Sequence, residues 1–218
     1  METLLSPRKW WRALKRRWLL YHLGDPAFRF MFDPSPANEW VSLDCETTGL
    51  NVRTDEIIAI GAVRIVGNRI LASERFEVLV RPDRGVAAQS VRIHRLRERD
   101  VAQGQPIDEA MMGLMRFIGS RPLVGYYLEF DLAMINRAIW PLLGQGLPQA
   151  RIEVSALYYD YKFRQIPAYL RQTNANIDLR FATMMKELDL PLRDAHDAVN
   201  DAVMAGLAFI KLRQLRDA

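Results

Sequence analysis

One run of residues sets the fold of this chain: Val41-Ser42-Leu43-Asp44-Cys45-Glu46-Thr47-Thr48-Gly49-Leu50. It is a short β-prone segment that delivers two carboxylates and then meets a polar turn containing glycine. Side chains at i and i+2 of a strand project from one face, so Asp44 and Glu46 should point together and Cys45 away from them. Two carboxylates this close repel, and burial without a counter-ion raises the pKa of at least one. A hard divalent cation, which prefers oxygen ligands, usually neutralises such a pair. The alternative is that the two acids lie at an exposed strand end and bind no metal.

A third carboxylate, Asp131, follows a short apolar strand that is predicted to end at Gly125. A helix with an apolar stripe at Phe130, Met134 and Ile135 is predicted to come next. Asp131 would then lie in the first turn of that helix, where a carboxylate complements the helix dipole with or without a metal. The local pattern therefore leaves a structural role and a metal-binding role open.

The remaining candidates are His196 and Asp201, at the start of an apolar-periodic segment that runs to about Leu215. Five residues on one helix turn through about 140°, so helical residues at this spacing cannot share a face. His196 should therefore precede the helix and Asp201 lie inside it, and both could then converge on a metal site. A purely structural histidine is the alternative.

Together these motifs resemble the DEDDh (DnaQ-like) family of 3′-5′ exonucleases, which includes the proofreading epsilon subunit of bacterial DNA polymerase III and stand-alone relatives. The resemblance covers about residues 39–215. Asp44-Cys45-Glu46-Thr47-Thr48-Gly49 matches the family's first motif, Phe130-Asp131 the core of the second, and the segment from His196 to Asp201 the third, in the family's order.

The resemblance implies an α/β, ribonuclease H-like fold with a mixed five-stranded sheet flanked by helices. It also implies two Mg²⁺ or Mn²⁺ ions. Asp44 would bridge both ions, Glu46 and Asp201 would hold the ion that activates water, and Asp131 would support the other ion. His196 would be the general base, since an unperturbed imidazole titrates at about pH 6.5.

Substrate contacts are implied by the resemblance for the residues of the first motif and its turn: Thr47, Thr48, Gly49 and Leu50. The family's second motif usually carries His-Asn, whereas this chain has Tyr126 and Tyr127 at those places. This departure changes the local contacts available to a substrate.

The function expected from the resemblance is hydrolysis of phosphodiester bonds at single-stranded DNA 3′ ends, which releases nucleoside 5′-monophosphates. An exoribonuclease of the same fold is one alternative, because the contacts that distinguish a 2′-hydroxyl cannot be located in the sequence. A non-catalytic module associated with a polymerase or a membrane is the other.

Alternating apolar patterns and turn signals predict the element order of the domain. Strands are expected near 40–45, 57–66, 69–80, 122–125 and 152–155, with Gly67-Asn68 as a tight hairpin turn. Helices are expected near 108–118, 129–140, 178–189 and 197–215. The segment 157–164 interleaves aromatic and basic residues, which suits stacked bases beside phosphates, although such aromatics more often fill a core.

The chain of 218 residues, half of them hydrophobic, is long enough to bury one core. We expect a basic leader and connector at residues 1–38 and an exonuclease domain at 39–218. The single cysteine excludes an internal disulfide and favours a reducing, cytoplasmic setting. No apolar run reaches the roughly 18 residues of a membrane span. The run 18–21 is too short for the core of a secretory signal.

The leader carries the net charge of the chain. Residues 1–24 hold six basic residues and one acid, and the remainder holds 24 basic and 25 acidic residues. In helical register one side collects basic residues and another collects large apolar ones: Arg8, Arg12, Lys15 and Arg16 against Trp10, Trp11, Leu14 and Trp18. Such a helix can lie on anionic lipid, grip phosphates, dock on a protein, or simply pack on the domain.

Overall fold

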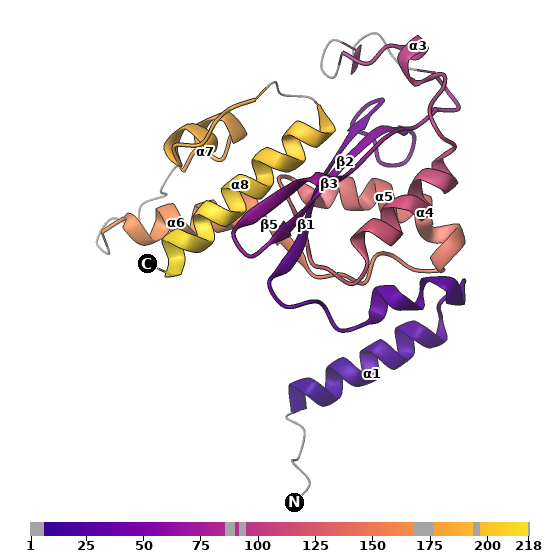
Figure 1. Cartoon of the computed structure of the whole chain (residues 1–218), viewed down its shortest axis with the longest axis horizontal. Helices are drawn as coiled ribbons and strands as arrows, with labels where there is room; N and C mark the ends of the chain where they lie inside the picture. Colours follow the sequence, from indigo (N-terminus) through magenta and orange to yellow (C-terminus); the bar gives the residue numbers. More distant parts are fainter. Residues whose placement is uncertain (1–6, 86–89, 92–94, 168–176, 194–196, 218) are drawn as a thin grey trace, which may run out of the picture.

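The computed structural model describes residues 7–85, 90–91, 95–167, 177–193 and 197–217. They form a five-stranded sheet in the order β3-β2-β1-β4-β5, with helices on both faces (Figure 1). Its strands are β1 Glu39–Thr47, β2 Ile57–Val66, β3 Arg69–Leu79, β4 Leu123–Gly125 and β5 Arg151–Glu153. The first three pair antiparallel, whereas β4 runs parallel to β1 and β5 parallel to β4. The expected mixed sheet is confirmed.

Helices cover the sheet in two layers. One face carries α4 Ile107–Ile118 and α5 Leu128–Leu143, and the other carries α6 Val154–Gln165, α7 Phe181–Glu187 and α8 Ala198–Asp217. Three further helices lie elsewhere in the described chain: α1 Pro7–Tyr21, the 3-10 helix η1 Pro26–Phe32 and α3 Glu98–Val101. No helix among the described residues is both long and apolar enough to cross a membrane.

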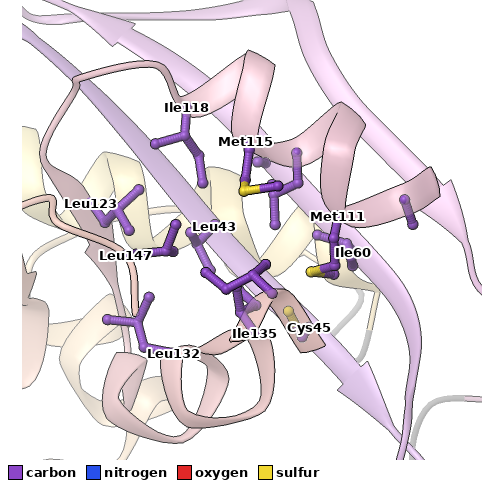
Figure 2. Packing of buried hydrophobic residues seen from close by; sticks show 14 of the residues in the cluster. Leu43, Cys45, Ile60, Met111, Met115, Ile118, Leu123, Leu132, Ile135 and Leu147 are labelled. Atoms are coloured by element: carbon purple, nitrogen blue, oxygen red, sulfur yellow. The ribbon is translucent and has the colours of Figure 1, made fainter. Parts of the chain in front are cut away.

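Strand β1 alternates between the two layers as the sequence predicts. Leu43 and Cys45 are buried in the core between β1, α4 and α5, where Figure 2 shows them beside Met111 and Ile135. Trp40 lies on the other side of the strand and packs edge-on against Phe209 of α8. The side chains of the even-numbered residues of β1 therefore face α8.

One expectation is confirmed and another needs correction. The segment 157–164 lies within a regular helix, α6, and packs on the core, as such aromatic residues more often do. Tyr158 is 1% exposed and donates a hydrogen bond to Glu187. The helix expected at 178–189 spans only Phe181–Glu187. It starts late because the Asp178 carboxylate accepts a hydrogen bond from the backbone N–H of Arg180, a local bond that competes with helix formation.

Candidate active site

The carboxyl ends of β1 and β4 meet at one edge of the sheet, since the two strands are parallel. Asp44 and Glu46 occupy the end of β1, and Asp131 lies in the first turn of α5, just after β4. The backbone N–H of Cys45 donates a hydrogen bond to the Asp131 carboxylate, which ties the start of α5 to the end of β1. Asp131 and Glu46 are 5% and 8% exposed, so both carboxylates are largely removed from water.

Asp201 reaches the same place from the first turn of α8. One carboxylate oxygen from each of Asp44, Glu46 and Asp201 lies within 4.8 Å of the others. Asp131 lines the same hollow but is not part of that closest group. The fifth predicted residue, His196, lies outside the described residues, so its role as general base stays a prediction.

A glycine allows α8 to approach this closely. Gly61 on β2 lies opposite Asp44 in the β1–β2 register. A Cβ atom at Gly61 would lie 2.2 Å from the backbone carbonyl carbon of Ala198, at the start of α8. The first turn of α8 therefore rests directly on the β2 backbone, which sets the position of Asp201. Sequence reasoning missed this role, although a lone glycine inside a strand can signal close backbone approach.

Glu153 positions the start of α5 in a comparable way. Its carboxylate accepts hydrogen bonds from the backbone N–H groups of Tyr127 at 3.1 Å, Leu128 at 2.9 Å and Ser155 at 3.1 Å. Tyr127 adopts a left-handed conformation with φ 52°, which lets the chain turn from β4 into the helix. The end of β5 thereby fixes the turn that delivers Asp131. Sequence reasoning missed Glu153, whose only signal is an acid inside the strand predicted at 152–155.

The turn after β1 is held by internal hydrogen bonds. The Thr47 hydroxyl donates to the carbonyl of Gly49 at 2.7 Å, and the Thr48 hydroxyl accepts from the N–H of Glu56 at 2.9 Å. A Cβ atom at Gly49 would lie 2.5 Å from the Asp55 carboxylate and would displace it from its hydrogen bond with the N–H of Asn51. Of the four residues expected to contact substrate, Thr47, Gly49 and Leu50 line the hollow. Contact by Thr48 stays a prediction, as do the other three contacts.

The buried carboxylates of the site repel one another. Burial raises the pKa of Asp44 well above its ordinary value, and the charges of Asp131, Asp201 and Glu46 raise it further. Burial also raises the pKa of Asp131, although the hydrogen bond from Cys45 opposes this effect. Either bound protons or an external cation would relieve this repulsion.

The pKa of Glu46 is raised for similar reasons. Burial, followed by the charges of Asp201 and Asp197, raises its pKa to about 7. None of the described residues that line the hollow is lysine or arginine. A converging set of buried and half-buried carboxylates without a basic partner in that lining fits Mg²⁺ or Mn²⁺, which take hard oxygen ligands.

The hollow has a volume of about 540 Å³, and one side of it is apolar and largely aromatic. The ring centroids of Tyr126 and Phe181 lie 4.6 Å apart, and those of Tyr126 and Tyr127 lie 4.5 Å apart. Tyr127 is 62% exposed and Leu50 is 86% exposed, so both offer apolar surface at the rim. The site thus combines a carboxylate cluster with surfaces on which flat rings can stack.

Comparison with known proteins points to one family. The RNase T family model, described as an exonuclease, matches residues 41–209. The chain is 30% identical over 174 residues to a DNA polymerase III subunit epsilon-like protein of Rhodobacter capsulatus, and the aligned region covers 79% of this chain and 23% of that protein. It is 25% identical over 193 residues to a PolC-type DNA polymerase III of Thermotoga maritima, and the aligned region covers 88% of this chain and 13% of that protein. The chain thus spans less than a quarter of the length of either relative.

Solved structures share the ribonuclease H-like fold of DnaQ-like exonucleases. A zinc-bound complex of E. coli exonuclease I with single-stranded DNA superposes with a TM-score of 0.67 and 18% identity, over 83% of this chain and 41% of that one. Exonuclease X in complex with 5′-overhanging duplex DNA superposes with a TM-score of 0.59 and 22% identity, over 82% of this chain and 93% of that one. At these identities the likeness concerns the fold alone.

Proposed function

Since the chain belongs to the RNase T exonuclease family, we propose that it is a metal-dependent 3′-5′ exonuclease that acts on single-stranded DNA ends and releases nucleoside 5′-monophosphates. The observation that carries the proposal is the convergence of Asp44, Glu46 and Asp201 from β1 and α8 to within 4.8 Å. An exposed acidic strand end would not draw in a carboxylate from a distant helix.

The proposed mechanism uses two metal ions. Four carboxylates would hold them: Asp44, Glu46, Asp131 and Asp201. Bound Mg²⁺ or Mn²⁺ would supply activation of the attacking water and stabilisation of the departing 3′ oxygen. Four carboxylates offset the charge of two divalent ions, so the loaded site would accept a phosphodiester without net repulsion. His196, from the third motif, would take the proton of the attacking water.

The aromatic lining of the hollow supports the proposed substrate. Its aromatic side suits an unstacked base, and base–aromatic stacking contributes about 1–3 kcal/mol per base regardless of sequence. Exonuclease I was solved in complex with single-stranded DNA, which supports the same class of substrate here. An exoribonuclease remains the second candidate, because stacking does not distinguish the two sugars.

A role in proofreading or DNA repair is proposed from the polymerase III relatives, of which this chain matches only a part. A cytoplasmic location is proposed because the sole cysteine, Cys45, is a buried free thiol.

A nuclease assay tests the proposed function. Purified protein should release mononucleotides from a 3′-labelled single-stranded DNA only when Mg²⁺ or Mn²⁺ is added. Asp44→Asn and Asp201→Asn should each lower the rate at least about a hundredfold, as loss of a group that stabilises transition-state charge does. Glu129→Gln is the matched control, since Glu129 is exposed in the same first turn of α5 as Asp131.

Full activity of either aspartate variant would refute the assignment. Parallel digestion of DNA and RNA oligonucleotides of one sequence decides between the two substrates. The non-catalytic alternative would be favoured if calorimetry detected no binding of Mn²⁺.

A further inference from the structure

The described side chains of the leader helix α1 attach it to the domain through one side. Leu19, Leu20 and Leu23 pack against the core near the carboxyl end of α5. The carbonyl of Leu19 accepts a hydrogen bond of 2.9 Å from the Gln145 side chain, and the N–H of Gly24 donates one of 2.9 Å to the carbonyl of Leu143. Hydrogen bonds and packing at this end hold the helix in a defined orientation at the periphery of the molecule (Figure 1).

The side of α1 that the domain leaves open is its aromatic side. The exposed fractions of its large residues are 57% for Trp10, 71% for Trp11, 41% for Leu14, 61% for Trp18 and 86% for Tyr21. At about 100° per residue these five fall within an arc of about 100°, and the anchoring Leu19 and Leu20 lie outside this arc, on the other side of the helix. An apolar helical face normally turns toward a core, so this face lacks its covering surface in the isolated chain.

Positive charge borders this aromatic face. Lys15 and Arg17 are exposed on its two flanks, and α1 contains no acidic residue. Arg16 lies on the attached side, where it donates a hydrogen bond to the carbonyl of Phe32 and pairs with Asp33. Tryptophan and tyrosine prefer the interface between lipid headgroups and acyl chains. Helices with a Trp-rich apolar side and Lys or Arg beside it lie in the plane of anionic bilayers.

We propose that α1 anchors this protein to the surface of an anionic lipid bilayer, with Trp10, Trp11, Leu14, Trp18 and Tyr21 inserted at the level of the headgroups. A single-stranded nucleic acid would pair with the cations and stack bases on the tryptophans, but it would leave the aliphatic Leu14 without an apolar partner. A second copy of the chain would bring two strongly basic leaders together, which like-charge repulsion opposes. The bilayer satisfies both the apolar face and its charged flanks.

The anchor would leave the candidate active site accessible. Helix α5 joins the two regions, because Asp131 lies in its first turn and Leu143 at its last residue contacts the leader. These residues are separated by about 18 Å along the helix axis. A membrane-bound α1 therefore covers the carboxyl end of α5 and leaves the opposite end, with the carboxylates, free for a polynucleotide.

Vesicle flotation of the full chain tests the proposal. The protein should float with phosphatidylcholine vesicles that contain about 30% phosphatidylglycerol, and much less with phosphatidylcholine alone, because each basic residue near an anionic surface contributes about fivefold to binding. The combined change Trp10→Ala, Trp11→Ala, Trp18→Ala should lower binding at least about tenfold, since the inserted apolar area is lost. Tyr159→Ala is the control, since Tyr159 is a 39% exposed aromatic residue on α6.

Charge reversal gives an independent measurement. Lys15→Glu with Arg17→Glu should reduce flotation more than tenfold, by about fivefold per basic residue, while turnover on a short oligonucleotide stays unchanged. Tryptophan fluorescence should shift to the blue with anionic vesicles and not with a single-stranded oligonucleotide.

Three results would overturn the membrane assignment. One is flotation that the tryptophan variant retains. Another is that the protein binds an oligonucleotide but not vesicles, and that the tryptophan variant no longer binds the oligonucleotide. This result would indicate a nucleic-acid surface. The third is a dimer in sedimentation that the same variant dissociates, which would indicate a second copy as the occupant.

Discussion

Replacing Glu46 with glutamine should stabilise the metal-free protein and weaken its response to metal. Glu46 is buried, and burial together with the charges of Asp201 and Asp197 raises its pKa from 4.5 to about 7. The folded chain therefore holds a proton on Glu46 more tightly than the unfolded chain does. The stability that results is present below about pH 4.5 and is lost as the pH rises through about 7.

The magnitude follows from the two pKa values. Above about pH 8 the carboxylate is ionised in both states, and the difference between 4.5 and about 7 corresponds to about 3 kcal/mol of lost stability. Glutamine has nearly the same shape and no charge, so Glu46→Gln should recover about 1–3 kcal/mol after allowance for altered hydrogen bonds. For a chain of this length this corresponds to a rise in Tm of about 3–10 °C.

Thermal unfolding followed by circular dichroism measures this effect. In EDTA near pH 8 the variant should unfold at a higher temperature than the wild type, and the advantage should shrink as the pH falls toward about 5. With Mn²⁺ the wild type should gain more stability than the variant, because a ligand stabilises the state that binds it. Glu129→Gln, an exposed change in the same region, should alter neither value. An unchanged or lower Tm for Glu46→Gln in EDTA near pH 8 would refute this account of the site.

Other perturbations test how the site is positioned. Gly61→Ala should destabilise the protein by about 1–3 kcal/mol and lower activity, because its Cβ would clash with the start of α8, and wild-type thermal unfolding would contradict this. Glu153→Gln should cost about 1–3 kcal/mol in urea unfolding, since charged hydrogen bonds to backbone N–H groups are lost, and the idea fails if stability and kcat are unchanged. Tyr127→Ala should raise KM for single-stranded DNA about tenfold with little change in Tm, and an unchanged KM would remove this tyrosine from the substrate surface. Removal of residues 1–18 should preserve turnover, whereas removal of 1–24 should also lower Tm because Leu19, Leu20 and Leu23 are lost from the core, so equal Tm values would contradict the anchoring.

The order of the elements was predictable because it depends on local periodicity. The hairpin at Gly67-Asn68 is confirmed, with Gly67 at φ 60°, as a tight turn requires. Helix α6 was not predicted, because its residues have no single apolar face along the sequence. Tyr158 donates a hydrogen bond to Glu187 of α7, whereas Tyr159 stacks on Phe163 within α6 itself. The pattern read alone left both a core and a nucleic-acid surface open.

The leader marks a similar limit. Its amphipathic character is visible in the sequence, and the helix is confirmed at Pro7–Tyr21. Which side meets the domain could not be foreseen, because the choice depends on the short leucine segment at its end and on partners in α5 that lie over a hundred residues away. The structure places the leucines inward and leaves the tryptophans exposed.

For the candidate site, backbone periodicity alone was enough to place Asp44 and Glu46 on one face of β1 with Cys45 behind them, because alternation is a property of every extended strand. The meeting of Asp201 with those two residues was decided by tertiary packing. It depends on Gly61, which has no side chain to hold α8 away from the sheet. Contacts between residues far apart in the chain depend on the volumes and backbone groups of the elements between them, and a local pattern does not contain that information.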